Sequence, residues 1–402
     1  MQRRDFLKYS GAGAVALGLG RAALAPDSAL AALCQGGATY NLTLTITDKA
    51  VEMVDGEWLN MLAFSVLSDP RGARVPGRVL RVKEGAVVNI TVFNSRPEPH
   101  GFEITGIPDS KIPSIDPGTS RCVSFVAPSG GTYMYHDSSY GPVYRVLGLH
   151  GTFIVEPKNS GTTPAGTPTP YSQGKLTPAV RLLMDAFGTH ERFPGEKWKP
   201  APSDQEYSDF EKIWVFSQID PKFNEKVEPE KPIVPNTLMD RIVENWLPRY
   251  FTINGRSGFY IEHDGDDAVP SNYIGEPTLL RILNAGLVQH AAHIHGNHVF
   301  DLSSAGPNGD VVVHDNVWER DVWPMAPMER RDVLLPYEVP PDIPRDFPAS
   351  MKQEPFPLRY VMHCHTEMSQ TAAGGSYPQG LVTHFEIRGP LGGRQRLRTA
   401  AR

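Results

Sequence analysis

From Tyr40 onward, apolar and polar residues alternate in short runs, and this period limits the possible folds more than any other feature. Residues 40–47 alternate through the sequence YNLTLTIT, and Val79 to Val82 and Val87 to Val92 follow the same period less regularly. Short alternating runs that Gly, Pro, Asn and Asp interrupt are typical of β-sandwiches and barrels. We therefore predict an all-β protein, with further strands at 121–126, 131–135, 152–155, 212–218, 250–254, 278–284, 299–303, 332–335, 359–362 and 381–387 and a short helix at 238–244.

The strand pattern is divided into two parts. Residues 159–205 contain stretches rich in Gly, Pro, Ser and Thr, which are typical of a linker. The 402 residues suffice for two or three domains. We expect a first domain at 38–158, the linker at 159–205, a second domain at 206–390 and a tail at 391–402.

The N-terminus has the pattern of an export signal. Arg3 and Arg4 precede Phe6-Leu7-Lys8, and a largely apolar run follows from Ala12 to Leu24. A charged start before a short apolar core is typical of a signal peptide, and paired arginines resemble the twin-arginine signal. The apolar run is short for a membrane span, which needs about 20 residues. We predict a signal at 1–34, a periplasmic or otherwise exported protein and no membrane span in the mature chain.

Charge and cysteine content limit the partners and the covalent bonds. The net charge is −6 and no basic block occurs, so we expect no nucleic-acid partner. The three cysteines are Cys34, Cys122 and Cys364. An exported protein can keep a disulfide, so a Cys34–Cys122 bridge is one option. It stays open, because Cys34 lies near the expected cleavage region.

Two histidine clusters in the second half indicate a metal site. His290, His293 and His295 form one cluster, and His363-Cys364-His365 forms the other. On a strand, residues i and i+2 point to the same face. His293 and His295 therefore share a face, as do His363 and His365, and Cys364 points to the opposite side. Imidazole and thiolate ligands together favour copper, whereas zinc motifs usually have wider ligand spacing.

These segments resemble the copper motifs of the multicopper oxidase family. Residues 290–296 (HAAHIHG) and 363–365 (HCH) are similar to its two C-terminal motifs, and residues 131–136 (GTYMYH) resemble a first-domain motif that ends at His136. The resemblance covers most of residues 40–390 and is closest to two-domain laccases and copper nitrite reductases. It implies two cupredoxin-like domains, which are Greek-key β-sandwiches.

The resemblance also implies a role for each residue. Cys364 and His290 would hold a type 1-like copper. A cluster of one to three further coppers would take His293 as its type 2 ligand and His295, His363, His365 and His136 as its type 3 ligands. Such a protein would oxidise a phenol or a metal ion and pass the electrons to the cluster, where oxygen is reduced. It would form a homotrimer that shares the cluster between subunits.

The sequence departs from the family pattern at the second type 1 histidine. Depending on how the apparent insertion at 371–377 is counted, that position is Ser369 or Ser376. Met368 or His384 are the candidates to replace the missing histidine.

The first domain departs from the family pattern as well. In one alignment His100 ends the early histidine motif. In the other, residues 103–106 occupy that motif and His100 takes the type 1 histidine position, with Asp137, Tyr144 and Leu149 around it. We favour the second alignment and keep His100 as a candidate ligand.

These departures leave two alternative functions open. One is a copper-binding or structural periplasmic protein without turnover, and the other is a nitrite-reductase-like copper enzyme. For the remaining histidines that we considered we expect structural or surface roles; these are His150, His190, His263, His298 and His314.

Overall fold

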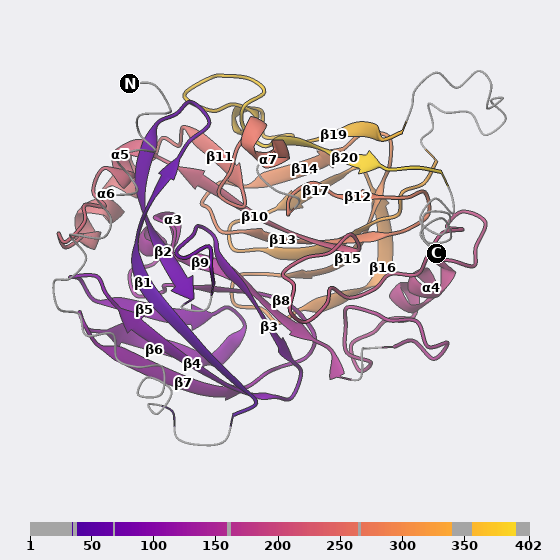
Figure 1. Cartoon of the computed structure of the whole chain (residues 1–402), viewed down its shortest axis with the longest axis horizontal. Helices are drawn as coiled ribbons and strands as arrows, with labels where there is room; N and C mark the ends of the chain where they lie inside the picture. The colour runs from indigo at the N-terminus through magenta and orange to yellow at the C-terminus, as the bar shows by residue number, and fades with distance from the viewer. Residues whose placement is uncertain are drawn as a thin grey trace.

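The computed structural model describes residues 34, 38–66, 69–158, 162–263, 267–339 and 356–390. Four sheets make up the described chain, two in each half of the sequence. Figure 1 shows the strands of the first half, in indigo and magenta, beside those of the second half, in orange and yellow. The prediction of an all-β protein is confirmed.

The first two sheets are built from strands β1 to β9. One sheet has the order β2-β1-β4-β7 and the other the order β3-β9-β8-β5-β6. The bounds are β1 Tyr40–Glu52, β2 Trp58–Val66, β3 Gly77–Lys83, β4 Val87–Asn94, β5 His100–Ile104, β6 Ile107–Ile115, β7 Ser120–Val126, β8 Gly131–His136 and β9 His150–Glu156.

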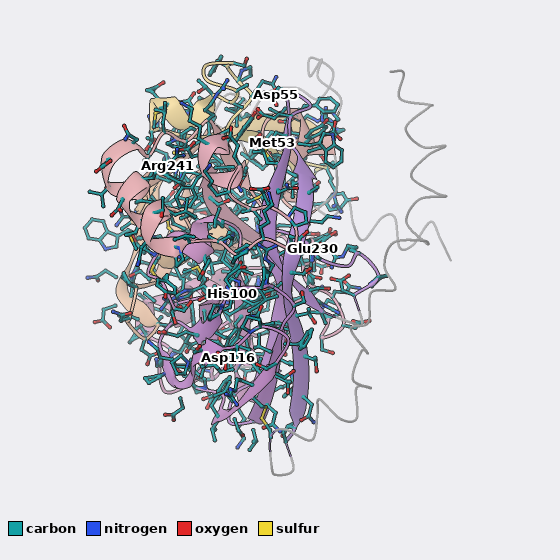
Figure 2. The ribbon with its side chains drawn as sticks, turned by 90° about the vertical axis from the view of Figure 1, so that its left-hand side faces the viewer. Met53, Asp55, His100, Asp116, Glu230 and Arg241 are labelled. Atoms are coloured by element: carbon teal, nitrogen blue, oxygen red, sulfur yellow. A yellow bond between two sulfur atoms is a disulfide. The ribbon has the colours of Figure 1, made fainter. Side chains whose placement is uncertain are left out.

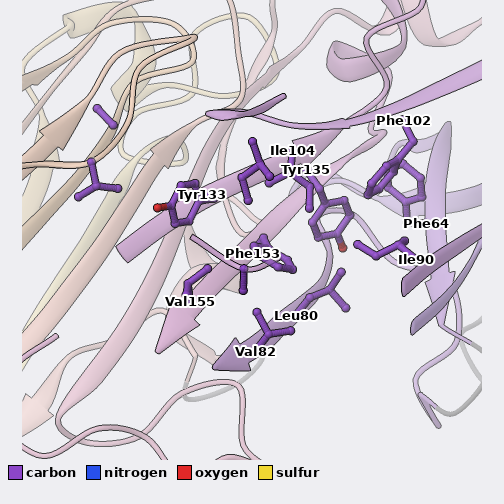
Figure 3. Close-up of a cluster of buried hydrophobic side chains, with 14 of the residues drawn as sticks. Phe64, Leu80, Val82, Ile90, Phe102, Ile104, Tyr133, Tyr135, Phe153 and Val155 are labelled. Atoms are coloured by element: carbon purple, nitrogen blue, oxygen red, sulfur yellow. The ribbon is translucent and has the colours of Figure 1, made fainter. Parts of the chain in front are cut away.

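The core of this first sandwich is aromatic and aliphatic. Phe64 lies 5.3 Å from Tyr135 and 6.1 Å from Phe102, measured between ring centroids. Figure 3 shows these rings together with Phe153 and the branched side chains of β3, β4, β5 and β9. Alternate residues of each strand face this core because successive side chains on a strand point to opposite faces.

The other two sheets are built from strands β10 to β20. Their orders are β11-β10-β13-β18-β15-β16 and β12-β20-β19-β14-β17. The bounds are β10 Glu211–Ile219, β11 Tyr250–Ile253, β12 Ser271–Asn272, β13 Thr278–Asn284, β14 His290–Ile294, β15 Val299–Ala305, β16 Val312–Arg320, β17 Val322–Met325, β18 Arg330–Leu335, β19 Leu358–Cys364 and β20 Val382–Ile387.

A buried ionic network joins the two halves. Glu211 of β10 accepts hydrogen bonds from Arg81 of β3 and from Arg281 of β13, both at 2.8 Å. Arg281 also donates to Thr132 of β8, whose hydroxyl donates to Asp332 of β18 at 2.7 Å. Each charge has an opposite partner, as buried charges require.

The long β1–β2 hairpin makes a second connection between the halves. Near its turn, Asp55 and Glu57 accept hydrogen bonds from the hydroxyl of Tyr250 on β11, at 2.9 Å and 2.7 Å. Figure 2 shows Met53 and Asp55 near one end of the molecule and His100 in its lower half. Met53 packs in one apolar cluster with Tyr250 and Ile219. The hairpin therefore extends from the first sandwich onto the second.

The helices are short and lie between strands. They are α3 Val143–Val146, α4 Pro178–Ala186, α5 Pro221–Asn224, α6 Pro235–Asn245, α7 Phe259–His263 and the 3₁₀ turn η3 Glu367–Gln370. The helix predicted at 238–244 lies within α6. The stretch 159–205 contains α4, and its Tyr171, Val180 and Trp198 are buried. That stretch therefore packs against the sandwiches, and the predicted domain boundaries stay a proposal. The predicted signal at 1–34 lies outside the described residues except for Cys34.

Candidate metal centre

Strands β14 and β19 bring the two histidine clusters together. They pair antiparallel, with Ala292 opposite Cys364 and His293 opposite His363. Residues that lie opposite each other on paired strands point to the same face of the sheet. His293 and His295 therefore share one face with His363 and His365. His293, His295, His363 and His365 lie on the partly exposed face, and Cys364 lies in the buried interior.

The four histidines of the exposed face form a compact group of rings. His293 lies 4.7 Å from His295, 5.1 Å from His363 and 4.7 Å from His365, measured between ring centroids. Nitrogen atoms of His293, His363 and His365 all lie within 4.8 Å of one another. The Nε2 atoms of His295 and His363 are 3.2 Å apart. Three or four imidazoles that converge in this way form a donor set suited to copper.

The ring orientations of His293 and His363 suit metal binding. The Nδ1 atom of His293 lies 2.9 Å from the carbonyl oxygen of Asp321, and the Nδ1 atom of His363 lies 3.4 Å from that of Cys364. Donation from Nδ1 to a carbonyl leaves Nε2 with a free lone pair. Burial and the neighbouring rings lower the pKa of both histidines. The neutral form, which can coordinate a metal, is therefore favoured.

The buried face holds a contact between His290 and Cys364. The Nδ1 atom of His290 lies 3.4 Å from the Sγ atom of Cys364, and the backbone N–H of Ala291 donates to the same sulfur at 3.4 Å. The side chain of Gln218 on β10 lies on the other side of the ring, with its Nε2 atom 2.5 Å from the Nε2 atom of His290. Burial lowers the pKa of His290 to about 4.

Among the described residues, none of the candidates for the missing second type 1 histidine forms a hydrogen bond with this sulfur. Ser369 is buried, but its hydroxyl donates to the carbonyl of Thr366 at 2.7 Å. Ser376 and Met368 are exposed. His384 pairs with the carboxylates of Glu262 and Glu386, through Nδ1 at 3.0 Å and Nε2 at 3.4 Å.

The first sandwich repeats this arrangement without a sulfur. His100 and His290 follow the buried asparagines Asn94 and Asn284 at the same spacing. Asp137 takes the place that Cys364 has in the second sandwich. Its Oδ2 atom lies 2.7 Å from Nδ1 of His100, and its Oδ1 atom accepts from the backbone N–H of Gly101 at 3.0 Å.

Both ring nitrogens of His100 have carboxylate partners. Besides Asp137 at Nδ1, Glu98 lies 3.2 Å from Nε2. Burial lowers the pKa of His100, but Asp137 and Glu98 outweigh it, so the net shift is upward. A metal at His100 would have to displace one of these carboxylates. The candidate ligand His100 therefore lies in an ionic cluster. It belongs to a different sheet from the histidines of β14 and β19.

His136 lies opposite His150 in the pairing of β8 and β9. The Nδ1 atom of His136 lies 3.1 Å from the carbonyl oxygen of Asp137. The Nδ1 atom of His150 lies 2.8 Å from the carbonyl oxygen of Arg145. The Nε2 atom of each ring is buried and has no hydrogen-bond partner among the described residues. The candidate ligand His136 thus has a free nitrogen, and so does His150, for which we expected a structural or surface role.

A comparison with family models gives a match for the first sandwich. Residues 72–160 match the family model described as multicopper oxidase. Over these residues the chain is similar to the multicopper oxidase family. Multicopper oxidases bind copper, and the triad His293, His363 and His365 is a possible metal site in this chain. This multicopper oxidase-like protein carries the matching residues in its first sandwich and the histidine clusters in its second.

Solved structures of other proteins share the fold. Blue copper oxidase from Nitrosomonas europaea is 21% identical with a TM-score of 0.59, and the alignment covers 87% of this chain and 86% of that one. The multicopper oxidase mgLAC is 21% identical, with a TM-score of 0.56 and coverages of 87% and 86%. Copper nitrite reductase from N. europaea is 16% identical, with a TM-score of 0.52 and coverages of 86% and 93%. The fold of two cupredoxin-like domains is therefore confirmed. Comparison with curated proteins found no match.

The N-terminal prediction is also supported. Residues 1–20 match the model of the twin-arginine translocation signal, which marks the chain for export to the periplasm. In the part of the chain that the structure describes, no helix has the length and apolar character to cross a membrane.

Sequence reasoning did not identify Gln218 as part of the site. It is a polar residue two positions after the apolar run Ile213 to Phe216, and it is fully buried. A buried amide needs hydrogen-bond partners, so its position in the strand was an available signal. Its contact with His290 joins residues that are far apart in the sequence, and only the fold reveals it.

Proposed function

We propose that this protein is an exported copper-dependent oxidoreductase that oxidises a phenol or a metal ion and reduces oxygen. The observation that carries the proposal is the convergence of nitrogen atoms from His293, His363 and His365 within 4.8 Å. These residues would hold the copper, with His295 beside them. Bound copper supplies one-electron transfer and oxygen chemistry, and the chain supplies the ligands and the surrounding field.

Access to the histidines supports a small reductant. A groove of about 460 Å³ lies beside them and is lined by His293, His295 and His298, together with Asn297, Asp321 and Glu338. Pockets of several hundred Å³ fit small molecules. A reductant in this groove would lie next to the metal-binding rings, so no long electron path through the protein is needed.

The partly exposed face also favours assembly. His295 and His365 are exposed in the single chain. The homotrimer that the resemblance implies would place a neighbouring copy beside this face. Light scattering of the copper-loaded protein tests this assembly, for which we expect the mass of three chains.

Oxygen uptake by purified, copper-loaded protein tests the proposed oxidation. We expect uptake with a phenol or with ferrous ion, and its loss in His363→Ala. His190→Ala is the matched control, since this histidine is exposed and lies outside the lining of the groove. Copper bound without uptake from either reductant would contradict the proposal and favour a copper-binding protein without turnover.

Nitrite reduction is the second candidate. A group of three converging histidines without a sulfur ligand is the observation that favours it, and a copper nitrite reductase shares the fold. Nitric oxide release from nitrite with a chemical reductant, together with the absence of oxygen uptake, would replace the first proposal by this one.

A further inference from the structure

The buried partner of the histidine cluster, His290 with Cys364, has a hydrogen-bond arrangement that bears on whether it can hold a metal. A type 1 copper needs a thiolate and free lone pairs on two histidine nitrogens. The family resemblance assigned His290 and Cys364 to such a site. The protonation of His290 can be deduced from its neighbours.

The orientation of the Gln218 amide follows from its contacts. Its Oε1 atom lies 2.7 Å from the backbone nitrogen of Leu287 and 3.1 Å from that of Val288. Backbone N–H groups only donate, so the amide atom that faces them must be the oxygen. The NH₂ group of Gln218 is therefore the group that faces His290.

The tautomer of His290 follows in turn. An amide NH₂ group only donates, and it lies 2.5 Å from Nε2 of His290, so Nε2 must accept. A neutral imidazole that accepts at Nε2 carries its proton on Nδ1. That proton points at Sγ of Cys364, 3.4 Å away. The Nδ1 atom then has no lone pair for a metal.

The local backbone holds Gln218 in this orientation. Gly286 leaves the space for the amide, because a Cβ atom there would lie 2.0 Å from Oε1 of Gln218. The carbonyl of Gly286 accepts from the guanidinium of Arg145 at 2.9 Å, and its N–H donates to Asn284 at 3.0 Å. Turning the amide over would place its NH₂ group against two N–H donors. Such a change leaves buried donors unpaired and costs free energy.

We infer that the His290–Cys364 position is a metal-free hydrogen-bonded pair, which Gln218 maintains, and not a type 1 copper site. The absence of a second histidine beside Cys364 in the described chain points the same way. The first sandwich has a similar arrangement, since Asp137 and His100 form a hydrogen-bonded pair at the equivalent position. Copper is then confined to the exposed histidines, and a reductant has to reach them directly.

Absorption and electron-resonance spectra of the copper-loaded protein test the inference. We expect bound copper without an intense thiolate-to-copper band, and the same copper content in Cys364→Ser. An intense visible band that Cys364→Ser abolishes, or loss of one copper per chain in that variant, would overturn it. The outcome is separate from the proposed function, because oxygen uptake can succeed or fail with either spectrum.

Nitrogen NMR of histidine-labelled, copper-free protein tests the role of Gln218 itself. We expect His290 to carry its proton on Nδ1 in the native chain and to lose this preference in Gln218→Leu. Gln173→Leu, at an exposed glutamine, is the control that leaves the signal unchanged. A proton on Nε2 of His290 in the native protein would overturn the inference even if Gln218→Leu fails to fold.

Discussion

His293 and His363 lie opposite each other on β14 and β19, with their ring centroids 5.1 Å apart. Their mutual position depends on the register of the two strands, because a shift by one residue would turn one of the rings to the buried face. Because the register and not the rings holds the strands in place, we expect that replacing one histidine reduces copper binding without changing the fold.

The first prediction concerns that substitution. His363→Ala removes one of three converging nitrogens, and we expect copper affinity to fall on the order of 10- to 100-fold or more, the range seen even for residues that only support a ligand. Copper titration followed by electron resonance measures it. His298→Ala should bind copper as the native chain does. Equal copper affinity in both variants would show that the triad does not bind the copper.

The second prediction concerns the ionic network between the halves. Glu211→Gln leaves Arg81 and Arg281 without their shared carboxylate, and breaking a buried ion pair costs about 3–5 kcal/mol. Urea unfolding should show a loss of this size. Glu225→Gln, at an exposed position, is the control. A loss below about 1 kcal/mol, typical of surface ion pairs, would mean that the network does not stabilise the assembled halves.

The same carboxyl gives a third prediction, on pH. Burial raises the pKa of Glu211, but Arg281 and Arg81 outweigh it and lower the value to about 2 from an ordinary 4.5. A lowered pKa stabilises the folded chain above the ordinary value, and this contribution is lost as the pH falls toward 2. The stability difference between the native chain and Glu211→Gln should therefore shrink over this range. A difference that stays constant down to the acid limit would contradict the pKa shift.

The fourth prediction concerns the disulfide Cys34–Cys122, which links residues 88 apart in the sequence. The chain-entropy model gives about 4–5 kcal/mol for closing a loop of this length. We expect Cys122→Ser to lose up to that much stability. The exported native protein should also retain Cys34, so that signal cleavage occurs before it. An intact mass that excludes Cys34 would show that the mature protein lacks this bond.

A fifth prediction separates the two sandwiches. Asp137→Ala leaves Nδ1 of His100 and the N–H of Gly101 without their buried partner, while Glu98 still pairs with Nε2 of His100, so we expect a stability loss of about 1–3 kcal/mol. Copper content should stay unchanged, because the copper ligands that we propose belong to the second sandwich. Calorimetry and elemental analysis of the same preparation give both values. Loss of copper with little loss of stability would assign a metal to the first sandwich.

The alternation of residues from Tyr40 onward was sufficient to predict an all-β fold, because strand period appears directly in a sequence. The spacing was sufficient to place His293 and His295 on one face of their strand, and His363 and His365 on one face of theirs. Their mutual distances depend on the register of β14 and β19, which the sequence does not encode locally.

Other features depend on contacts between distant segments. The amide of Gln218 acts through Leu287, Val288 and His290, which lie on another part of the chain. The opposition of His136 and His150 depends on the pairing of β8 with β9. The ordered packing of α4 could not be read from a stretch whose Gly and Pro content is typical of linkers.

Anomalous diffraction at the copper edge, from crystals of the copper-loaded protein, locates the bound metal. We predict a copper peak among the imidazoles of His293, His363 and His365, with none between His290 and Cys364. Copper located beside the sulfur of Cys364, or absent from the three imidazoles, would contradict it.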